Sequence, residues 1–323
     1  MAYCKRDKEM KILNVSRTDW AGFSYDNAMA LRSVGVDAES LCMIAHSFNY
    51  ANCSTPATRE TIIRKMKEAD VVQIMHSCSF SLNYYIISGT KAKLIVYHTG
   101  SIYRNDPVIF NKLFHNAHIH MTDQCEFMLI GDNKNKFKYI ATAVNTDIIK
   151  RSTKTLSNPI SFGHYPSNPA VKGSDTILKV IGDIKNQIEY RDRFSFMFSS
   201  DIVNHDKQLE RMNDCDVYIE LFKPILDGKK YGCYGVTAFE AAAMGKIVIT
   251  QNIYEQIYNE TYGLKSEFII ANTEEELSIA IRGLGELSPK LIMELQDKTY
   301  QWLVDNHSYK STGTRLINIL CNQ

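Results

Sequence analysis

The sequence predicts an α/β protein built from two Rossmann-like domains, each with a parallel sheet. Short β-branched runs alternate with amphipathic segments along the whole chain, which is typical of repeated βαβ units. The length of 323 residues suits two domains of about 150 residues each. A polar stretch without periodicity, residues 150–159, interrupts the alternation and is expected to be a linker. We therefore expect an N-terminal domain over 1–152, a C-terminal domain over 153–306, and a last segment, 307–323, that packs back on the N-terminal domain.

Composition and charge are those of an ordinary globular protein. Hydrophobic residues make up 45% of the chain and charged residues 23%, which excludes a disordered or fibrous protein. The net charge of +1 disfavours a protein that holds nucleic acid mainly by neutralising phosphates. No run reaches the roughly 18 apolar residues of a membrane-spanning helix. We expect neither an integral membrane segment nor a secretory signal.

The cysteines give no sign of a metal or disulfide framework. All eight are scattered, and no two have the C-x-x-C spacing that zinc ribbons and dithiol motifs require. Free thiols in a reducing compartment are the simplest account, so the expected location is the cytoplasm. No metal site is expected.

The N-terminal half shows six short apolar runs that predict strands. They lie at 10–15, 40–44, 71–75, 94–97, 119–121 and 138–140. An amphipathic stretch through Ala28 and Leu31 predicts a helix that stops at Gly35, because glycine adopts the left-handed conformation of a helix end at little cost. A second helix is predicted over 61–69, leading into the strand at 71.

The C-terminal half repeats the alternation. Its strands are predicted at 160–162, 194–198, 217–221, 246–250 and 268–270, and its helices at 175–188, 206–213, 236–244, 274–284 and 289–306. Two such halves joined by one linker make a cleft between two sheets. Ligands of these folds bind beyond the carboxyl ends of the strands, so the loops there are where chemistry is expected.

The first candidate loop, residues 163–175, joins a predicted strand to a predicted helix. Five apolar residues of that helix are expected to form one stripe: Ile177, Leu178, Ile181, Ile184 and Ile188. Lys172 and Gly173 therefore lie at the approach to a helix N-terminus. Free N–H groups and the helix dipole favour an anion at such a place, and a lysine adds a full charge. A surface turn with a solvated lysine is the equally weighted alternative.

The second candidate loop, residues 230–245, follows the strand predicted at 217–221. Gly232 and Gly235 allow the backbone to pass close to a ligand. The helix after them is rich in alanine, and Glu240 interrupts that small-sided surface. A carboxylate there can accept hydrogen bonds from the two adjacent hydroxyls of a ribose, each worth about 1.5–3 kcal/mol. The alternative is a solvated surface glutamate, which is the usual fate of this residue type.

Several segments together resemble one enzyme family. The stretches HYPSNPAVKGSD and YGCYGVTAFEAAAMGKIVI resemble the lysine-glycine loop and the glycine loop with its "EAMA-x-G-x-P-V-I" helix in glycosyltransferase family 4. In the N-terminal half, the residues ADVV, YHTGS and AVNTD resemble the family's "D-V-V-H" strand, "H-G-S" loop and "G-V-D-T" turn. The motifs occur in the family's order from residue 10 to about 309. The resemblance implies a GT-B architecture, in which two Rossmann-like domains with parallel sheets face a central cleft.

The resemblance also implies roles for individual residues. Lys172, with Gly173, would bind the diphosphate of a nucleotide-sugar donor, and Glu240 would bind the ribose. His98 would face the transferred sugar, and with Lys172 it forms the expected catalytic pair. The remaining expected donor contacts are the backbone N–H groups of Gly235, Val236 and Thr237, the cleft-lining Gly22, and His164, which is one candidate for the arginine that the family has before its lysine-glycine pair.

The family's mechanism would follow from these roles. The expected reaction moves a sugar from the donor to an acceptor hydroxyl with retention of configuration. The leaving diphosphate helps to deprotonate the acceptor, and no catalytic metal or other cofactor is needed. One departure concerns the sugar: the family often has a second glutamate eight positions before Glu240, where this chain has Gly232. Glu220 lies too far upstream to be assigned that role from spacing.

Other functions of the same architecture stay open at this point. A hydroxymethylated DNA base is one alternative acceptor, supported by a basic stretch that comprises Lys134, Lys136, Lys138, Lys150, Arg151 and Lys154. A nucleotide-sugar epimerase and a non-catalytic nucleotide-sugar binding protein are two more, the latter because of Gly232. A carbohydrate or glycolipid acceptor is the leading expectation. Donor base, donor sugar and oligomeric state are left open.

Overall fold

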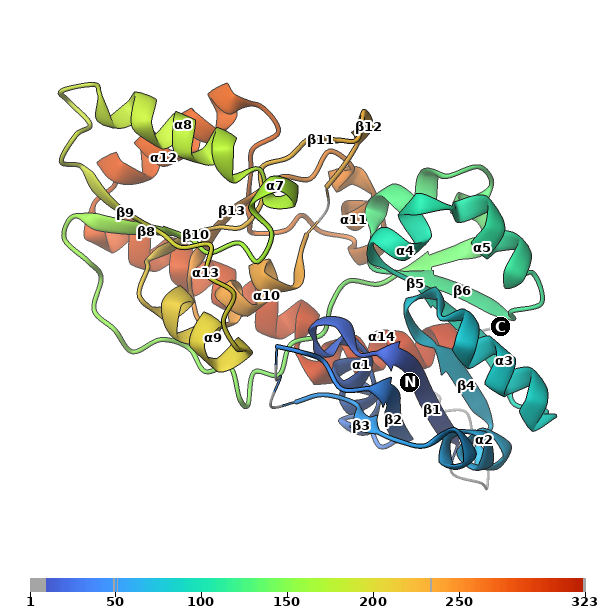
Figure 1. The fold of residues 1–323 in the computed structure, drawn as a ribbon. Helices are drawn as coiled ribbons and strands as arrows, with labels where there is room; N and C mark the ends of the chain where they lie inside the picture. Colours follow the sequence, from blue (N-terminus) through green and yellow to red (C-terminus); the bar gives the residue numbers. More distant parts are fainter. Residues whose placement is uncertain (1–9, 49, 51, 233, 322–323) are drawn as a thin grey trace. The chain divides into compact units, whose positions relative to one another are not determined.

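A computed structural model describes residues 10–48, 50, 52–232 and 234–321. The chain forms two compact units (Figure 1). Unit 1 comprises Met1–Asn145 together with His307–Gln323, and unit 2 comprises Thr146–Asn306. The first boundary lies a few residues before the expected one because the polar stretch belongs to unit 2. There Ser152 N donates to Met244 O, and Ser157 N donates to the carboxylate of Asp216.

Unit 1 is built on a seven-stranded sheet in which every pair of neighbours is parallel. The strands follow the order β3-β2-β1-β4-β5-β6-β7. Their bounds are β1 (Lys11–Thr18), β2 (Asp37–Ile44), β3 (Thr55–Pro56), β4 (Val71–Ile74), β5 (Lys93–His98), β6 (Ile119–Thr122) and β7 (Phe137–Tyr139). The order reverses between β1 and β4, so the switch point of this sheet lies at their carboxyl ends.

Helices cover both faces of this sheet, as the near-continuous apolar strands require. Helices α1 (Phe23–Arg32) and α14 (Tyr309–Cys321) pack with strand residues such as Ile12 on one face. Helices α2 (Arg59–Glu68) and α3 (Ser79–Ser88) pack with residues such as Leu13 on the other. The short helices α4 (Gly100–Asn105), α5 (Pro107–Leu113) and α6 (Asn133–Lys136) complete the unit.

Unit 2 is built on a five-stranded parallel sheet in the order β14-β13-β10-β8-β9. The bounds are β8 (Ile160–His164), β9 (Phe194–Phe198), β10 (Val217–Ile219), β13 (Ile247–Thr250) and β14 (Ile269–Ile270). A two-stranded hairpin, β11 (Ile225–Leu226) with β12 (Lys229–Lys230), stands beside it. The strand order reverses between β8 and β10, which makes their carboxyl ends the switch point of this sheet.

The helices of unit 2 also form two layers. Figure 1 shows α8 (Ser174–Lys185) and α12 (Glu274–Glu286) over one face of the sheet, and α9 (His205–Asn213) and α10 (Val236–Ala243) on the other. One apolar cluster joins α8 and α12 to alternate residues of the central strands. The remaining helices are α7 (Pro169–Lys172), α11 (Glu255–Tyr262) and α13 (Pro289–His307). Within the described residues, no helix combines the length and the apolar character needed to cross a bilayer.

The α/β class and the parallel sheets are confirmed, and some details of the elements differ. The apolar stripe of α8 is formed by Ile177, Val180, Ile181 and Ile184. The helix ends at Lys185, so Ile188 lies beyond it and is 84% exposed. The residues expected as an "H-G-S" loop are divided, because β5 ends at His98 and α4 begins at Gly100. Sequence periodicity did not predict α3, α4, α5, α6, α7, α11 or α14.

Candidate functional site

An ion pair lies at the switch point of the unit 2 sheet. Glu220 follows directly after β10, and its side chain has no exposed surface. Lys172, the last residue of α7, pairs with it through Nζ. The second carboxylate oxygen of Glu220 accepts a hydrogen bond of 2.8 Å from the Thr250 hydroxyl at the end of β13. A buried carboxylate needs such partners, and the lysine side chain, 21% exposed, still reaches solvent.

The turn that places Lys172 accepts only glycine at its next position. Gly173 has a left-handed φ of 70°, and a Cβ built on it would lie 1.7 Å from the backbone oxygen of Phe222. The Lys172 carbonyl in turn accepts from Phe222 N at 3.0 Å. The lysine-glycine turn is therefore fastened to the chain just after Glu220. As expected from the sequence, Gly173 precedes the first residue of α8.

The glycine loop passes directly beside this ion pair. A Cβ at Gly235 would lie 2.3 Å from Glu220 Oε1 and 3.1 Å from Lys172 Nζ. Gly235 is also the N-cap of α10, so Val236 and Thr237 supply the first N–H groups of that helix. Such N–H groups have no hydrogen-bond partner within the helix, and they form the positive end of the helix dipole. The structure thus brings together Lys172 and the helix N-terminus, the combination that favours a phosphate.

Glu240 lies one turn further along α10. It is 5% exposed, so the solvated surface position considered from the sequence is excluded. His205 Nε2, from the start of α9, lies 2.7 Å from Glu240 Oε1. Burial acts to lower the pKa of His205, but the hydrogen bond and the charge of Glu240 outweigh it and raise the pKa above its ordinary value. The histidine fixes one carboxylate oxygen, which orients Glu240 for contacts through the other.

His164 is buried at the carboxyl end of β8 and contacts the segments that carry the site. Its ring has no exposed surface, with Nδ1 2.7 Å from Ile219 O and Nε2 2.8 Å from the Ser174 hydroxyl. Burial lowers the pKa of His164 to about 4, so the ring is neutral at physiological pH. In this structure it ties together the ends of β8 and β10 and the first residue of α8.

Gly232 is packed against the Gln251 side chain, which a larger residue at this position would have to displace. A Cβ there would lie 2.0 Å from Gln251 Nε2, and the backbone φ is +114°. Gln251 Nε2 donates to Tyr231 O at 2.8 Å, and its Oε1 accepts from Lys223 N. Gln251 therefore fills the position beside Gly232.

Two strained loops lie at the switch point of the unit 1 sheet. Ala21 and Gly22 follow β1 with φ values of 57° and 68°, and His76 and Ser77 follow β4 with 57° and 52°. Left-handed conformations are costly for residues other than glycine and are enriched at functional sites. Hydrogen bonds hold the second loop, because His76 Nδ1 lies 2.6 Å from the Thr99 hydroxyl.

Asp19 anchors the first of these loops. It has no exposed surface and accepts from Ser24 N at 2.8 Å and from the Ser54 hydroxyl at 2.7 Å. Its Oδ1 lies 4.0 Å from His76 Nε2. Burial acts to raise the pKa of Asp19, but the neighbouring His76 and the Ser54 hydroxyl outweigh it and hold the pKa below its ordinary value. Asp19 is therefore a buried negative charge in contact with the first loop and close to His76 of the second.

His98, the predicted N-terminal catalytic residue, is buried within unit 1. Its ring has no exposed surface, with Nδ1 2.8 Å from the Ser77 hydroxyl and Nε2 3.0 Å from His120 Nδ1. Burial and the neighbouring His120 lower the pKa of His98 well below its ordinary value. Through the Ser77 hydroxyl it contacts the strained loop after β4.

A pocket of about 430 Å³ opens beside the strained loops. Its lining comes from β1 and the following loop, the end of β2, the loop after β4, and α3, α4 and α5. The lining residues are Arg17, Thr18, Trp20, Ile44, His76, Ser77, Cys78, Ser79, Phe80, Ile102 and Phe110. This position at the switch point is where ligands of open α/β sheets bind. We call it the switch pocket.

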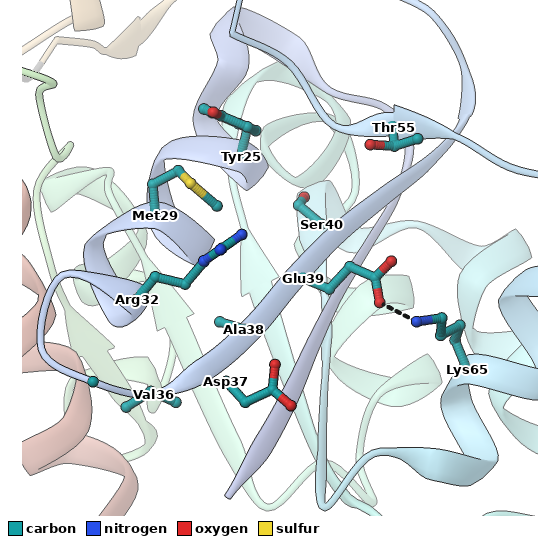
Figure 2. A pocket seen from close by; sticks show the side chains of 11 residues that line it. Tyr25, Met29, Arg32, Val36, Asp37, Ala38, Glu39, Ser40, Thr55 and Lys65 are labelled. Atoms are coloured by element: carbon teal, nitrogen blue, oxygen red, sulfur yellow. Dashed lines mark ion pairs between the residues drawn. The ribbon is translucent and has the colours of Figure 1, made fainter.

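Another pocket, of about 740 Å³, lies at the opposite end of the strands (Figure 2). It surrounds the beginning of β2, with Tyr25, Met29 and Arg32 on α1 at one side. On the side of β2 away from α1, Glu39 and Lys65 form an ion pair of 2.8 Å. Because it lies at the amino end of the sheet, it is the weaker candidate for a reaction site.

Three side chains of the unit 2 site were not predicted from the sequence: Glu220, Thr250 and His205. Glu220 and Thr250 each stand at the end of an apolar run, so the rule that ligands bind beyond strand ends could have indicated them. His205 lies far from Glu240 in sequence and gave no local signal. Among the described residues, no group of three or more His, Cys, Asp or Glu side chains is placed to hold a metal ion.

Comparisons with known proteins identify the fold. No family model matches the sequence, and no curated protein matches it. Among solved structures, a glycosyltransferase from Rickettsia africae ESF-5 has a TM-score of 0.63 and 15% identity over 98% of this chain and 100% of that one. HepE of Anabaena, solved with UDP-glucose, has a TM-score of 0.67 and 12% identity over 97% of this chain and 100% of its own.

A third similar structure is a sucrose-phosphate synthase from Thermosynechococcus elongatus. Its TM-score is 0.59, with 12% identity over 97% of this chain and 98% of that one. The chain therefore matches solved GT-B glycosyltransferase structures along nearly its whole length. The predicted fold class, α/β with two parallel Rossmann-like sheets of the GT-B type, is confirmed.

Proposed function

We propose that this protein is a glycosyltransferase that uses a nucleoside diphosphate sugar as donor. One observation carries the proposal: at the switch point of the unit 2 sheet, Lys172 lies beside the N-terminus of α10, and Glu240 is buried one turn further along that helix. The first two suit a diphosphate, and the buried carboxylate of Glu240 suits the hydroxyls of a ribose. HepE, which shares the fold, binds UDP and UDP-glucose, and this supports a uridine nucleotide as the first donor to test.

The charges of the site suit the chemistry of glycosyl transfer. Breaking the bond between the sugar and the diphosphate leaves negative charge on the departing phosphate. A lysine and a helix N-terminus that are already in place stabilise this charge without reorganisation. Following the resemblance to glycosyltransferase family 4, we propose retention of configuration. The departing phosphate then takes the proton of the acceptor hydroxyl, and neither a catalytic metal nor another cofactor takes part.

The remaining predicted residues enter the proposal in supporting roles. Gly173 and His164 hold the lysine turn and the strand ends in place. In unit 1, Gly22 belongs to the loop beside the switch pocket, and His98 positions Ser77 within it. We assign the acceptor hydroxyl to this pocket. The free thiols of the described cysteines support the expectation of a cytoplasmic enzyme.

A DNA acceptor is less well supported by the structure. Three residues of the basic stretch pair with acids: Lys136 with Asp132, Arg151 with Asp297 and Lys154 with Asp214. Paired cations contribute less to phosphate binding, so a carbohydrate or glycolipid acceptor stays the better proposal.

The donor proposal is tested by nucleotide binding and sugar release. A thermal-shift screen of nucleotide sugars should show stabilisation by UDP-glucose or a related donor, because a ligand at 100 times its dissociation constant adds about 2.7 kcal/mol. Glu240→Gln should weaken donor binding, while Glu210→Gln, on the exposed surface of α9, should not. Slow hydrolysis of a labelled donor would distinguish an enzyme from a binding protein. Absence of nucleotide binding in both screen and calorimetry would reject the proposal.

A further inference from the structure

The switch pocket of unit 1 combines an apolar mouth with a polar inner end. Four large apolar side chains line it and remain about half exposed: Trp20 at 52%, Ile44 at 50%, Phe80 at 49% and Ile102 at 43%. A single exposed apolar residue is ordinary, but several around one pocket indicate a binding surface. Two buried polar residues, His76 at 5% and Ser77 at 1% exposed, line the same pocket.

The apolar mouth and the polar inner end of the pocket are each fixed by contacts with neighbouring side chains. The Arg17 guanidinium lies 5.3 Å from the centre of the Phe80 ring, a cation–π distance that fixes the aromatic wall. The polar residues stand in left-handed backbone conformations and are fastened to Thr99 and His98 by hydrogen bonds of 2.6 and 2.8 Å. The pocket is thus a preformed site with a defined polarity along its depth.

We propose that the acceptor is amphipathic, with a hydroxyl-bearing sugar head and an apolar tail or ring. The apolar part lies between Trp20, Phe80 and Ile102, and the hydroxyl end approaches His76 and Ser77. This inference rests on the proposed function, which it makes more specific by naming the class of acceptor.

The charges of the pocket favour this class over a nucleic acid. Among the described residues that line it, Arg17 is the one arginine or lysine, and it already lies over the Phe80 ring. A nucleic acid would bring phosphates that need several cations. An uncharged glycoside needs none, and burial of its apolar tail strengthens its binding.

A matched pair of acceptor analogues tests the inference. Octyl and methyl β-D-glucoside share one head group, so a difference in affinity reports the tail alone. Both are titrated below the micelle concentration into the full chain with UDP present, and the emission of Trp20 is followed. We expect octyl glucoside to bind at least about tenfold more tightly, which corresponds to about 1.4 kcal/mol, and to shift the emission to the blue. Trp20→Phe should remove the signal.

Two surface isoleucines provide the variant and its control. Ile102→Ser, inside the pocket, should reduce the preference for octyl glucoside at least about fivefold. Ile87→Ser, on α3 outside the pocket lining and 55% exposed, should leave it unchanged. Equal affinity for the two glucosides, or an equal loss in both variants, overturns the inference.

Calorimetry with UDP separates this result from the donor proposal. If UDP binds and the octyl preference is missing, the acceptor class is wrong and the donor site stands. If octyl glucoside binds but no nucleotide does, the glycosyltransferase function fails, and with it the assignment of the ligand as an acceptor.

Discussion

At the scale of single residues, the site depends on the carboxylate of Glu220, whose role could not be assigned from its position in the sequence. Glu220 is fully buried; Lys172 balances its charge, and the Thr250 hydroxyl donates a hydrogen bond to it. In sequence, Lys172 and Glu220 are 48 positions apart, so only the fold shows that they are partners. The lysine therefore has two tasks: it neutralises a buried carboxylate, and it offers a partly exposed cation to a ligand. Breaking a buried pair costs about 3–5 kcal/mol, which has to be separated from any effect on catalysis.

Replacing Lys172 should impair both stability and activity, and a second change should restore only stability. Lys172→Ala is expected to lower kcat/KM by roughly 30- to 1000-fold, the loss of about 2–4 kcal/mol of transition-state stabilisation. Lys172→Ala combined with Glu220→Gln removes the uncompensated charge, so it should recover much of the stability while activity stays low. Urea unfolding and initial rates with labelled donor measure the two quantities. Activity within threefold of the wild type would remove Lys172 from the phosphate role. Lys179→Ala, at an exposed lysine of α8, is the control and should leave the activity unchanged.

The pair of His205 and Glu240 makes part of the stability depend on pH. Because the folded-state pKa of His205 is raised, its contribution is complete below the unfolded pKa of about 6.5 and is lost as pH rises through the folded pKa. His205→Gln should therefore destabilise the protein by about 1.5–3 kcal/mol near pH 6 and by much less near pH 9. Urea unfolding across this range gives the difference. A constant difference at all pH values would show that the pair is not linked to protonation.

At the scale of elements, the glycine loop and α10 form one rigid unit with the ion pair. Gly235→Ala would place a methyl group against the buried Glu220 carboxylate. We expect a loss of about 1–3 kcal/mol of stability and at least a tenfold loss of UDP affinity, because the start of α10 must move. Gly182→Ala, in α8 with nothing within 4 Å of the new Cβ, should stabilise by about 0.5–1 kcal/mol. Melting curves and calorimetry test both; an unaffected UDP affinity in Gly235→Ala would contradict the placement.

Much of the element pattern could be predicted from the sequence, and the exceptions have physical reasons. Strands and amphipathic helices of unit 2 follow the two periodicities closely. Helix α3 has no charged residue, so its sequence lacks the charged face that would mark a helical period. Helix α14 contains Gly313, which reads as an interruption but in fact allows close contact with α1. Lys172, Gly235 and Glu240 could be proposed from local motifs, whereas the pairing of Glu220 with Lys172 and of His205 with Glu240 depends on long-range packing.

At the scale of the whole molecule, helix α14 packs on unit 1 although it follows unit 2 in the sequence. Helix α14 packs on α1, where a Cβ at Gly313 would lie 2.0 Å from the Ala30 oxygen. The Tyr309 hydroxyl donates to Asp26 at 2.5 Å. Helices α1 and α14 thus share one apolar cluster of unit 1, while unit 2 has its own.

Gly313→Ala should therefore destabilise unit 1 selectively. The added methyl group meets backbone that cannot move without separating α14 from α1. We expect faster hydrogen exchange in peptides from α1 and β2 and unchanged exchange in α8 and α10. Gly283→Ala, in α12 with open space around it, is the matched control. Equal acceleration in both units would contradict the independence of the two cores.

The most direct test of the central claim is a crystal structure of the chain with UDP. We predict electron density for the diphosphate against Lys172 and the first turn of α10, with the ribose hydroxyls on the free side of the Glu240 carboxylate. Density for UDP elsewhere, or a ribose turned away from Glu240, would contradict the donor site proposed here.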